Sequence, residues 1–197
     1  MLSEPALRDL YLNQKVSVSV IAKRYKCSER KINYWLLKYN IPKRSISEAL
    51  YQKYNPKGDP FNIKEVNSIE DAKLMGLGLG LYWGEGNKKN KNTIRLGNTD
   101  PHLIKKFLHF LIRILRVETK KIRFGLQVFS DMSKDKVLLF WLNELHEFKI
   151  SPQQFFKVII TPARSLGTYR EKSQYGVLTV YFCNVKLKKI LDSMLPL

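Results

Sequence analysis

The sequence predicts an α+β protein in which an all-helical N-terminal segment precedes a domain of mixed helices and strands. Apolar residues recur at helical spacing over the first 44 residues. Strand-like alternation at residues 93–98 and 122–129 is interrupted by helical patterns. Pro42, Pro56, Gly58 and Pro60 punctuate the stretch between. We therefore expect domains at residues 1–44 and 66–197, joined by a linker at 45–65 that contains a short helix.

The charge predicts an anionic partner. The 197 residues include 35 Lys and Arg against 17 Asp and Glu, a net charge of +18. The excess lies in residues 1–60, 86–125 and 157–189, which carry +7, +9 and +6. Although a solvated lysine-rich face could account for any one block, three together favour nucleic acid over membrane lipid.

The cysteines and the apolar runs predict the cellular location of the protein. Cys27 and Cys183 lack the spacing of a metal site, which is typical of a reducing compartment. No apolar run approaches the roughly 20 residues of a membrane span, and Met1 is not followed by a signal-peptide pattern. We expect no membrane contact and a cytoplasmic, DNA-associated protein.

Three helices are predicted in the first segment. The first covers residues 6–12, and Ser17 is placed to cap the second. Ser28 is placed to cap the third, at residues 29–39, whose apolar stripe includes Ile32 and Leu36. The outward face of this third helix is basic.

This segment, SVIAKRYKCSERKINYWLLKYNI, resembles a DNA-binding helix-turn-helix over about residues 4–44. Lys26 stands where that turn usually carries glycine. The resemblance implies that the third helix enters the major groove. A helical protein-contact domain is the alternative. The expected DNA contacts here are Ser28, Arg30, Lys31, Asn33, Tyr34, Lys38, Lys43 and Arg44.

Residues 69–86 predict a glycine-rich helix. Dinucleotide and P-loop templates both fail on this stretch. In a helix, Gly76, Gly80 and Gly84 share one face. Because each glycine costs a helix about 1 kcal/mol relative to alanine, this face is expected to pack closely on another helix. Leu77, Leu81 and Tyr82 are expected to face the core.

The rest of the chain alternates strands and helices. Strands are expected at residues 93–98, 122–129, 156–161 and 176–184. Asp100 is placed to cap a helix at 101–115, Ser133 begins another, and residues 185–194 form a closing helix.

Within the glycine-rich helix, GLGLYWGEG (residues 78–86) resembles the LAGLIDADG motif of homing endonucleases. Both key glycines and the acid before the last one are shared, although Glu85 replaces the usual aspartate. The resemblance implies an αββαββα saddle across residues 66–197. The first strand of that plan, just after Gly86, would be short or missing.

The resemblance also implies a chemistry. Two copies would pair along the motif helix, and Glu85 with the Gly84 carbonyl would bind Mg²⁺ for phosphodiester hydrolysis. Gln127 is the nominated water-positioning residue, and Lys172 or Arg164 the nominated transition-state cation. The expected dimer interface is Gly76, Leu77, Gly80, Leu81 and Gly84.

The strands and basic loops are expected to contact double-stranded DNA. Related folds also include regulators that bind DNA without cleaving it, so that alternative stays open. The expected contacts are Lys88, Lys89, Lys91, Arg95, Lys121, Arg123, Gln127, Arg164, Arg170, Thr179 and Tyr181.

Overall fold

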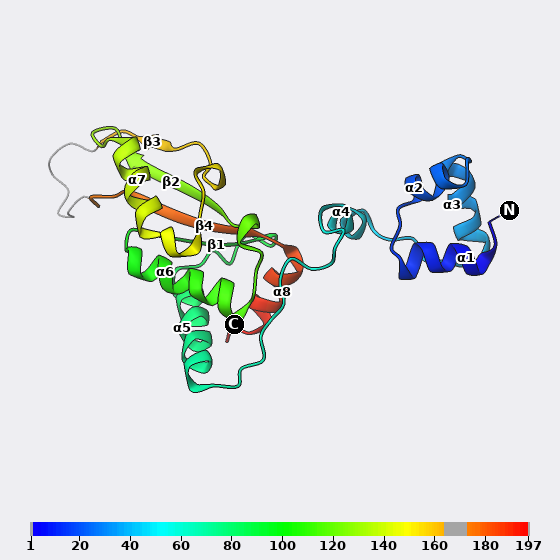
Figure 1. The fold of residues 1–197 in the computed structure, drawn as a ribbon, viewed down its shortest axis with the longest axis horizontal. Helices are drawn as coiled ribbons and strands as arrows, with labels where there is room; N and C mark the ends of the chain where they lie inside the picture. The colour runs from blue at the N-terminus through cyan, green and yellow to red at the C-terminus, as the bar shows by residue number, and fades with distance from the viewer. Residues whose placement is uncertain (1, 164–172, 197) are drawn as a thin grey trace. The chain divides into compact units, whose positions relative to one another are not determined.

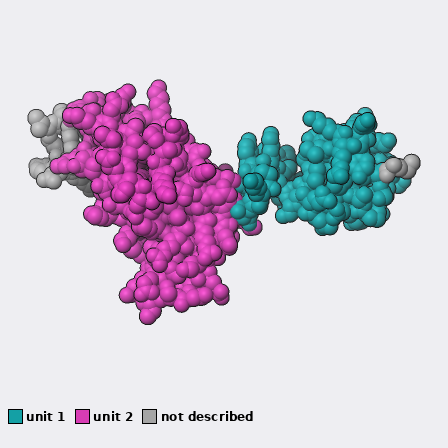
Figure 2. All heavy atoms as spheres, in the orientation of Figure 1, with its two compact units in different colours: residues 1–59 teal, residues 60–197 magenta. Residues whose placement is uncertain are grey.

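The chain forms two compact units. The structure, a computed structural model, describes residues 2–163 and 173–196. Unit 1 comprises residues 1–59 and unit 2 residues 60–197 (Figures 1 and 2). Each described unit has a buried hydrophobic core of its own.

Unit 1 is helical. Its elements are α1 (Glu4–Arg8), a π-helical turn (Asp9–Asn13), α2 (Val18–Arg24), α3 (Glu29–Lys38) and α4 (Ile46–Tyr54). Ser17 and Ser28 cap α2 and α3 through their side chains, as predicted. Lys26, in the turn between them, has a φ of 50°, the left-handed conformation that glycine adopts most easily. The core includes Leu7, Ile21, Ile32 and Leu36, each at most 1% exposed.

Arg44 attaches the segment before α4 to the π-helical turn and the residues that follow it. Its guanidinium donates to the carbonyls of Lys15 (2.7 Å) and Val16 (2.5 Å) and to the side chain of Gln52. It also lies over the Tyr11 ring, with Cζ 4.1 Å from the centroid. These contacts make α4 part of unit 1, where we had predicted a linker.

Unit 2 is a mixed helix-and-strand domain. Its longer elements are α5 (Ile69–Glu85), β1 (Thr93–Asn98), α6 (Pro101–His109), β2 (Arg123–Phe129), α7 (Lys134–Glu144), β3 (Ile159–Thr161), β4 (Val177–Cys183) and α8 (Val185–Ser193). A π-helical turn (Phe110–Ile114) extends α6. Short 3₁₀ turns lie at Thr119–Lys121, His146–Phe148 and Pro152–Gln154.

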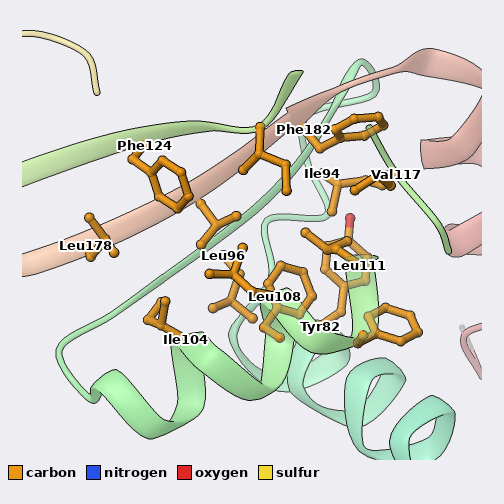
Figure 3. Close-up of a cluster of buried hydrophobic side chains, with 14 of the residues drawn as sticks. Tyr82, Ile94, Leu96, Ile104, Leu108, Leu111, Val117, Phe124, Leu178 and Phe182 are labelled. Carbon is orange, nitrogen blue, oxygen red and sulfur yellow. The ribbon is translucent and has the colours of Figure 1, made fainter. Parts of the chain in front are cut away.

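The strands form one sheet in the order β1-β4-β2-β3, antiparallel except for the parallel pair β2 and β3. Alternate strand residues, among them Ile94, Leu96, Phe124 and Phe182, are at most 1% exposed. Figure 3 shows these side chains facing Tyr82 of α5 and the helical residues below the sheet. Because the helices share this one core, they cover one face of the sheet, and no described helix covers the other, which we call the open face.

Residues 60–64 belong to unit 2 and bind the end of the α6 helix. The amides of Asn62 and Lys64 donate to the carbonyls of Leu115 (3.1 Å) and Ile114 (2.7 Å), which have no partner within their own helix. Lys64 also pairs with buried Asp71. That hydrogen bond from Lys64 is the main reason the pKa of Asp71 lies below its ordinary value. Only the middle of the predicted linker therefore connects the units.

The mixed helix-and-strand class is confirmed, but the element order differs from the αββαββα plan. Gly86 forms a single bridge to Leu96 where the plan has its first strand, as the sequence indicated. In addition, α7 lies between β2 and β3. A connection of that length lets the two strands run parallel, which a hairpin cannot.

Candidate nucleic-acid interface

The two faces of α5 differ in their packing. A Cβ atom at Gly78 would lie 2.1 Å from the ring of Phe110, so this glycine contacts the core directly. A Cβ atom at Gly76, Gly80 or Gly84 would meet nothing within 4 Å. The predicted glycine face is therefore open within the described residues of this chain.

The apolar residues of α5 follow the same division. Tyr82 is fully buried and Leu81 packs partly on the core, as we predicted. Leu77 is 44% exposed, so the prediction that it faces the core is wrong. It lies beside Gly76 and Gly80 on the open face, together with Trp83, which is 49% exposed.

Glu85 is exposed at the C-terminal end of α5. Gly86 caps the helix, donating its amide to the Tyr82 carbonyl at 2.9 Å. A Cβ atom at Gly86 would lie 2.3 Å from that carbonyl oxygen, so a side chain there would force the turn apart. Position 86 therefore requires glycine, because the Tyr82 carbonyl approaches its Cα too closely for a side chain.

The tip of α5 lies against the outer edge of β1. Gly86 bridges Leu96, and the Asn87 amide donates to the Arg95 carbonyl at 2.8 Å. Lys88 Nζ donates to the Trp83 carbonyl at 2.5 Å, near the end of the helix where cations are favoured. Asn87 is therefore the residue opposite Arg95, and Glu85 lies one residue before the bridge to β1.

A buried charged cluster lies behind this tip. Lys188 of α8 is fully buried and pairs with Asp192, with a 2.6 Å hydrogen bond to Oδ1. Its Nζ lies 5.6 Å from the centre of the Tyr82 ring. The Tyr82 hydroxyl donates to the Asn87 carbonyl at 3.3 Å. The cluster thus joins α8 to the loop that follows Glu85.

Two titratable groups in this cluster have raised pKa values. Burial raises the pKa of the Tyr82 phenol, against the opposing effect of Lys188. Burial alone would lower the pKa of Lys188, but hydrogen bonds to Asp192 and Tyr82 outweigh it and raise the value. Both groups therefore hold their protons more tightly than in an unfolded chain.

Two arginines and a tyrosine form one cross-strand row on the open face. The register pairs Arg95 with Tyr181 and Tyr181 with Arg123. Arg95 Cζ lies 5.2 Å from the centroid of the Tyr181 ring. The adjacent cross-strand row consists of the small residues Gly97, Thr179 and Gly125. We call the first set the Arg95–Tyr181–Arg123 row.

Gln127 is exposed on β2 but lies far from Glu85 of the same chain. Strands β1 and β4 stand between β2 and the tip of α5. Three strand spacings amount to about 14 Å, more than one bridging water spans. The described chain therefore does not bring these two nominated catalytic residues together.

The other basic residues of unit 2 that we expect to contact DNA differ in their surroundings. Lys89 and Lys91 are exposed in the loop after the tip. Lys121 Nζ lies 4.0 Å from Glu118 Oε2, in an ion pair between partly exposed side chains. The nominated Arg164, Arg170 and Lys172 lie outside the described residues.

In unit 1 the outward face of α3 presents Arg30, Lys31, Tyr34 and Lys38, all exposed, with Ser28 exposed at its start. Lys38 Nζ lies 4.9 Å from the centre of the Trp35 ring.

The other residues of unit 1 that we expect to contact DNA have different surroundings from those on the outward face of α3. Asn33 is half-buried and donates its side-chain amide to the Glu29 carbonyl at 2.9 Å. Lys43 is exposed, whereas the Arg44 guanidinium is occupied by the internal contacts described above. Arg44 thus serves the packing of unit 1.

Sequence reasoning named Arg95, Arg123 and Tyr181 separately but missed that they share one row. It also missed Lys188, which a helical stripe alone assigns to the surface. Only the strand order shows the first relation. The signal for Lys188 was its spacing of four from Asp192 on one helix face.

A scan against protein-family models, a search of curated proteins and a search of solved structures each found no match. The resemblance to the LAGLIDADG motif rests on residues 78–86 and on the elements around them. No helix among residues 2–163 and 173–196 is long and apolar enough to cross a membrane.

Proposed function

We propose that this protein binds double-stranded DNA in a sequence-specific manner and hydrolyses it as a homodimer of the LAGLIDADG type. One observation carries the proposal. A glycine-rich helix with an open face ends in an exposed acid, beside a sheet whose open face carries the Arg95–Tyr181–Arg123 row. An acid held among cations suits metal-assisted chemistry on a phosphate backbone.

Both units offer surfaces for DNA. The exposed cations of α3 suit major-groove entry by a capped helix, and α2 and α3 meet at a short turn, as in a helix-turn-helix. The open sheet face and the lysines at 88, 89 and 91 supply a second cationic surface. We propose that the protein makes both contacts on one target.

The dimer would form along α5. Gly76, Gly80 and Gly84 lie one above another, and a Cβ atom at each would meet nothing within 4 Å among residues 2–163 and 173–196; Leu77 and Trp83 flank them. Backbones approach closely only where side chains are absent, so this face suits a second copy of the same helix. One motif per chain then gives two acids per dimer and a roughly palindromic target.

Mg²⁺ would be held by the Glu85 carboxylate and the Gly84 carbonyl. The donors fit, because Mg²⁺ prefers oxygen ligands, keeps several waters and binds substrate phosphates beside one or two carboxylates. When bound, it supplies a Lewis acid and lowers the pKa of a coordinated water. The chain positions the acid through the Gly86 cap and the bridge to β1.

A non-cleaving DNA-binding regulator is the second candidate. It is favoured by unit 1, which has its own core and a basic α3. It is also favoured by the distance between Gln127 and Glu85, which leaves the acid without the nominated partner from its own chain.

The test begins with duplexes selected by the protein from a randomised DNA library. The selected duplexes are incubated with protein and Mg²⁺, and strand breaks are mapped. We expect cleavage that Glu85→Gln abolishes while binding stays within a few-fold. The matched control is Glu70→Gln, an exposed acid at the other end of α5, which should cut normally. Cutting that persists in Glu85→Gln refutes the site, and selection without cutting supports the regulator.

A further inference from the structure

The Arg95–Tyr181–Arg123 row is held in place by its neighbours. Phe156 meets the Tyr181 ring edge-on, with centroids 5.5 Å apart. A Cβ atom at Gly125 would lie 3.0 Å from Tyr181 Cε2, so the ring lies low over that glycine. The tyrosine is therefore a fixed platform in the middle of the sheet.

The arginines at its two ends are ordered differently. Arg95 is exposed with its guanidinium over the Tyr181 ring, and no acceptor bonds that guanidinium among the described residues. Arg123 donates through Nη1 to the carbonyls of Lys120 (2.6 Å) and Ile122 (3.0 Å). Within the described part of the chain its other nitrogens have no bonded partner. Each guanidinium therefore keeps donors free on a side chain that its surroundings already orient.

The span of the row matches a DNA groove. Arg95 and Arg123 lie two strand spacings apart, about 10 Å between backbones. The major groove of B-DNA is about 12 Å wide. The Tyr181 ring lies over Gly125 in the neighbouring row, between the two arginines.

We propose that Arg95 and Arg123 are specificity-determining residues that each read a guanine through the major groove. Guanine presents two adjacent acceptors there, O6 and N7, which match two donors of one guanidinium. The Tyr181 ring beside Arg95 and the backbone carbonyls bonded to Arg123 orient these guanidiniums, whose planar pair of donors a lysine lacks. Because each protomer carries both arginines, we expect each half-site of the target to contain two guanines that are read in this way. This inference rests on the DNA binding proposed above but not on cleavage.

The test uses the full-length protein and the duplex it prefers from a randomised library. Each guanine of that duplex is replaced in turn by 7-deazaguanine, which lacks the N7 acceptor. We expect about 10-fold or greater loss of affinity at two positions per half-site and little loss elsewhere. Because this measurement uses the unaltered protein, it does not depend on any variant folding.

Variants then assign the positions. Arg95→Ala should remove the 7-deazaguanine effect at one position and Arg123→Ala at the other, with unchanged circular dichroism. The matched control, Lys89→Ala, alters an exposed loop lysine and should weaken all sequences alike.

The outcomes separate the two proposals. Failure of the unaltered protein to bind any duplex overturns the proposed function and the guanine reading together. Binding with no guanine position sensitive to 7-deaza substitution overturns only the guanine reading. So does a uniform loss of affinity in both arginine variants, which identifies phosphate contacts instead.

Discussion

Tyr82, Lys188 and Asp192 link α8 to the loop behind Glu85. The phenol is bonded to the Asn87 carbonyl, and the ammonium is bonded to Asp192 beneath it. Replacing a buried ion pair by apolar residues is often neutral for stability, so we assign this pair a role in orientation rather than in stability. The cluster fixes where the chain goes after the acid.

The raised pKa values of Tyr82 and Lys188 predict a loss of stability at alkaline pH. A group that binds its proton more tightly when folded stabilises the fold below its unfolded pKa, about 10 for both, and that contribution is lost as the pH rises further. Tyr82→Phe should cost about 1 kcal/mol at pH 8, since it removes one hydrogen bond, and should flatten the decline above pH 10. Urea unfolding between pH 8 and 11 measures both effects. Parallel pH curves for the two proteins would contradict this prediction.

Helix α5 has one face in the core and one that no described residue of this chain covers. Gly78 touches Phe110, whereas Gly80, two residues later, faces open space. Gly78 and Gly80, which the sequence pattern of residues 78–86 does not distinguish, therefore have different physical roles. The buried one permits folding of unit 2, and the open one is available to a second chain.

Alanine at these two positions separates the roles. Gly78→Ala should lower the free energy of unfolding by about 1–3 kcal/mol, because the new methyl group overlaps the Phe110 ring. Gly80→Ala should raise it by about 0.5–1 kcal/mol in the monomer, where alanine is the better helix former. Sedimentation should then show weaker dimerisation for Gly80→Ala. A protein that stays monomeric at micromolar concentration, with or without this change, would refute the α5 dimer.

At the scale of the whole molecule, the charge of +18 is divided between two units that each fold around their own core. Arg44 holds α4 to unit 1, and residues 60–64 are bonded to the end of α6 in unit 2. Residues 55–59 are thus the connection between the units.

If both units contact phosphates, the salt dependence of DNA binding should be the sum of two contributions. Each phosphate contact adds about 0.9 to the slope of log K against log salt concentration. We expect Arg30→Gln combined with Lys31→Gln to lower the slope by about 1–2 in the full-length protein. Fluorescence anisotropy on one duplex between 50 and 300 mM salt is the measurement. Equal slopes would place α3 away from the DNA backbone.

The local features of this chain could be predicted from the sequence. Ser17, Ser28, Asp100 and Ser133 each cap the helix expected of them, because a cap involves only the residues that follow it. The strand at residues 93–98 agrees with its alternating pattern. The strand expected at residues 156–161 is shorter, Ile159–Thr161, because the pairing with β2 is interrupted: Phe155 bridges Phe124 in a register one residue different from that of Gln127 and Ile159.

Residue types and their periodicity determined the helices, the strands, the concentration of charge and the acid at the end of a glycine-rich helix. Tertiary structure alone decided that Gly78 is packed and Gly80 is open, since the two differ only in what lies above them. It also decided that Arg95, Tyr181 and Arg123 share a row, through the strand order β1-β4-β2. Strand pairing depends on contacts between distant segments, which local pattern does not encode.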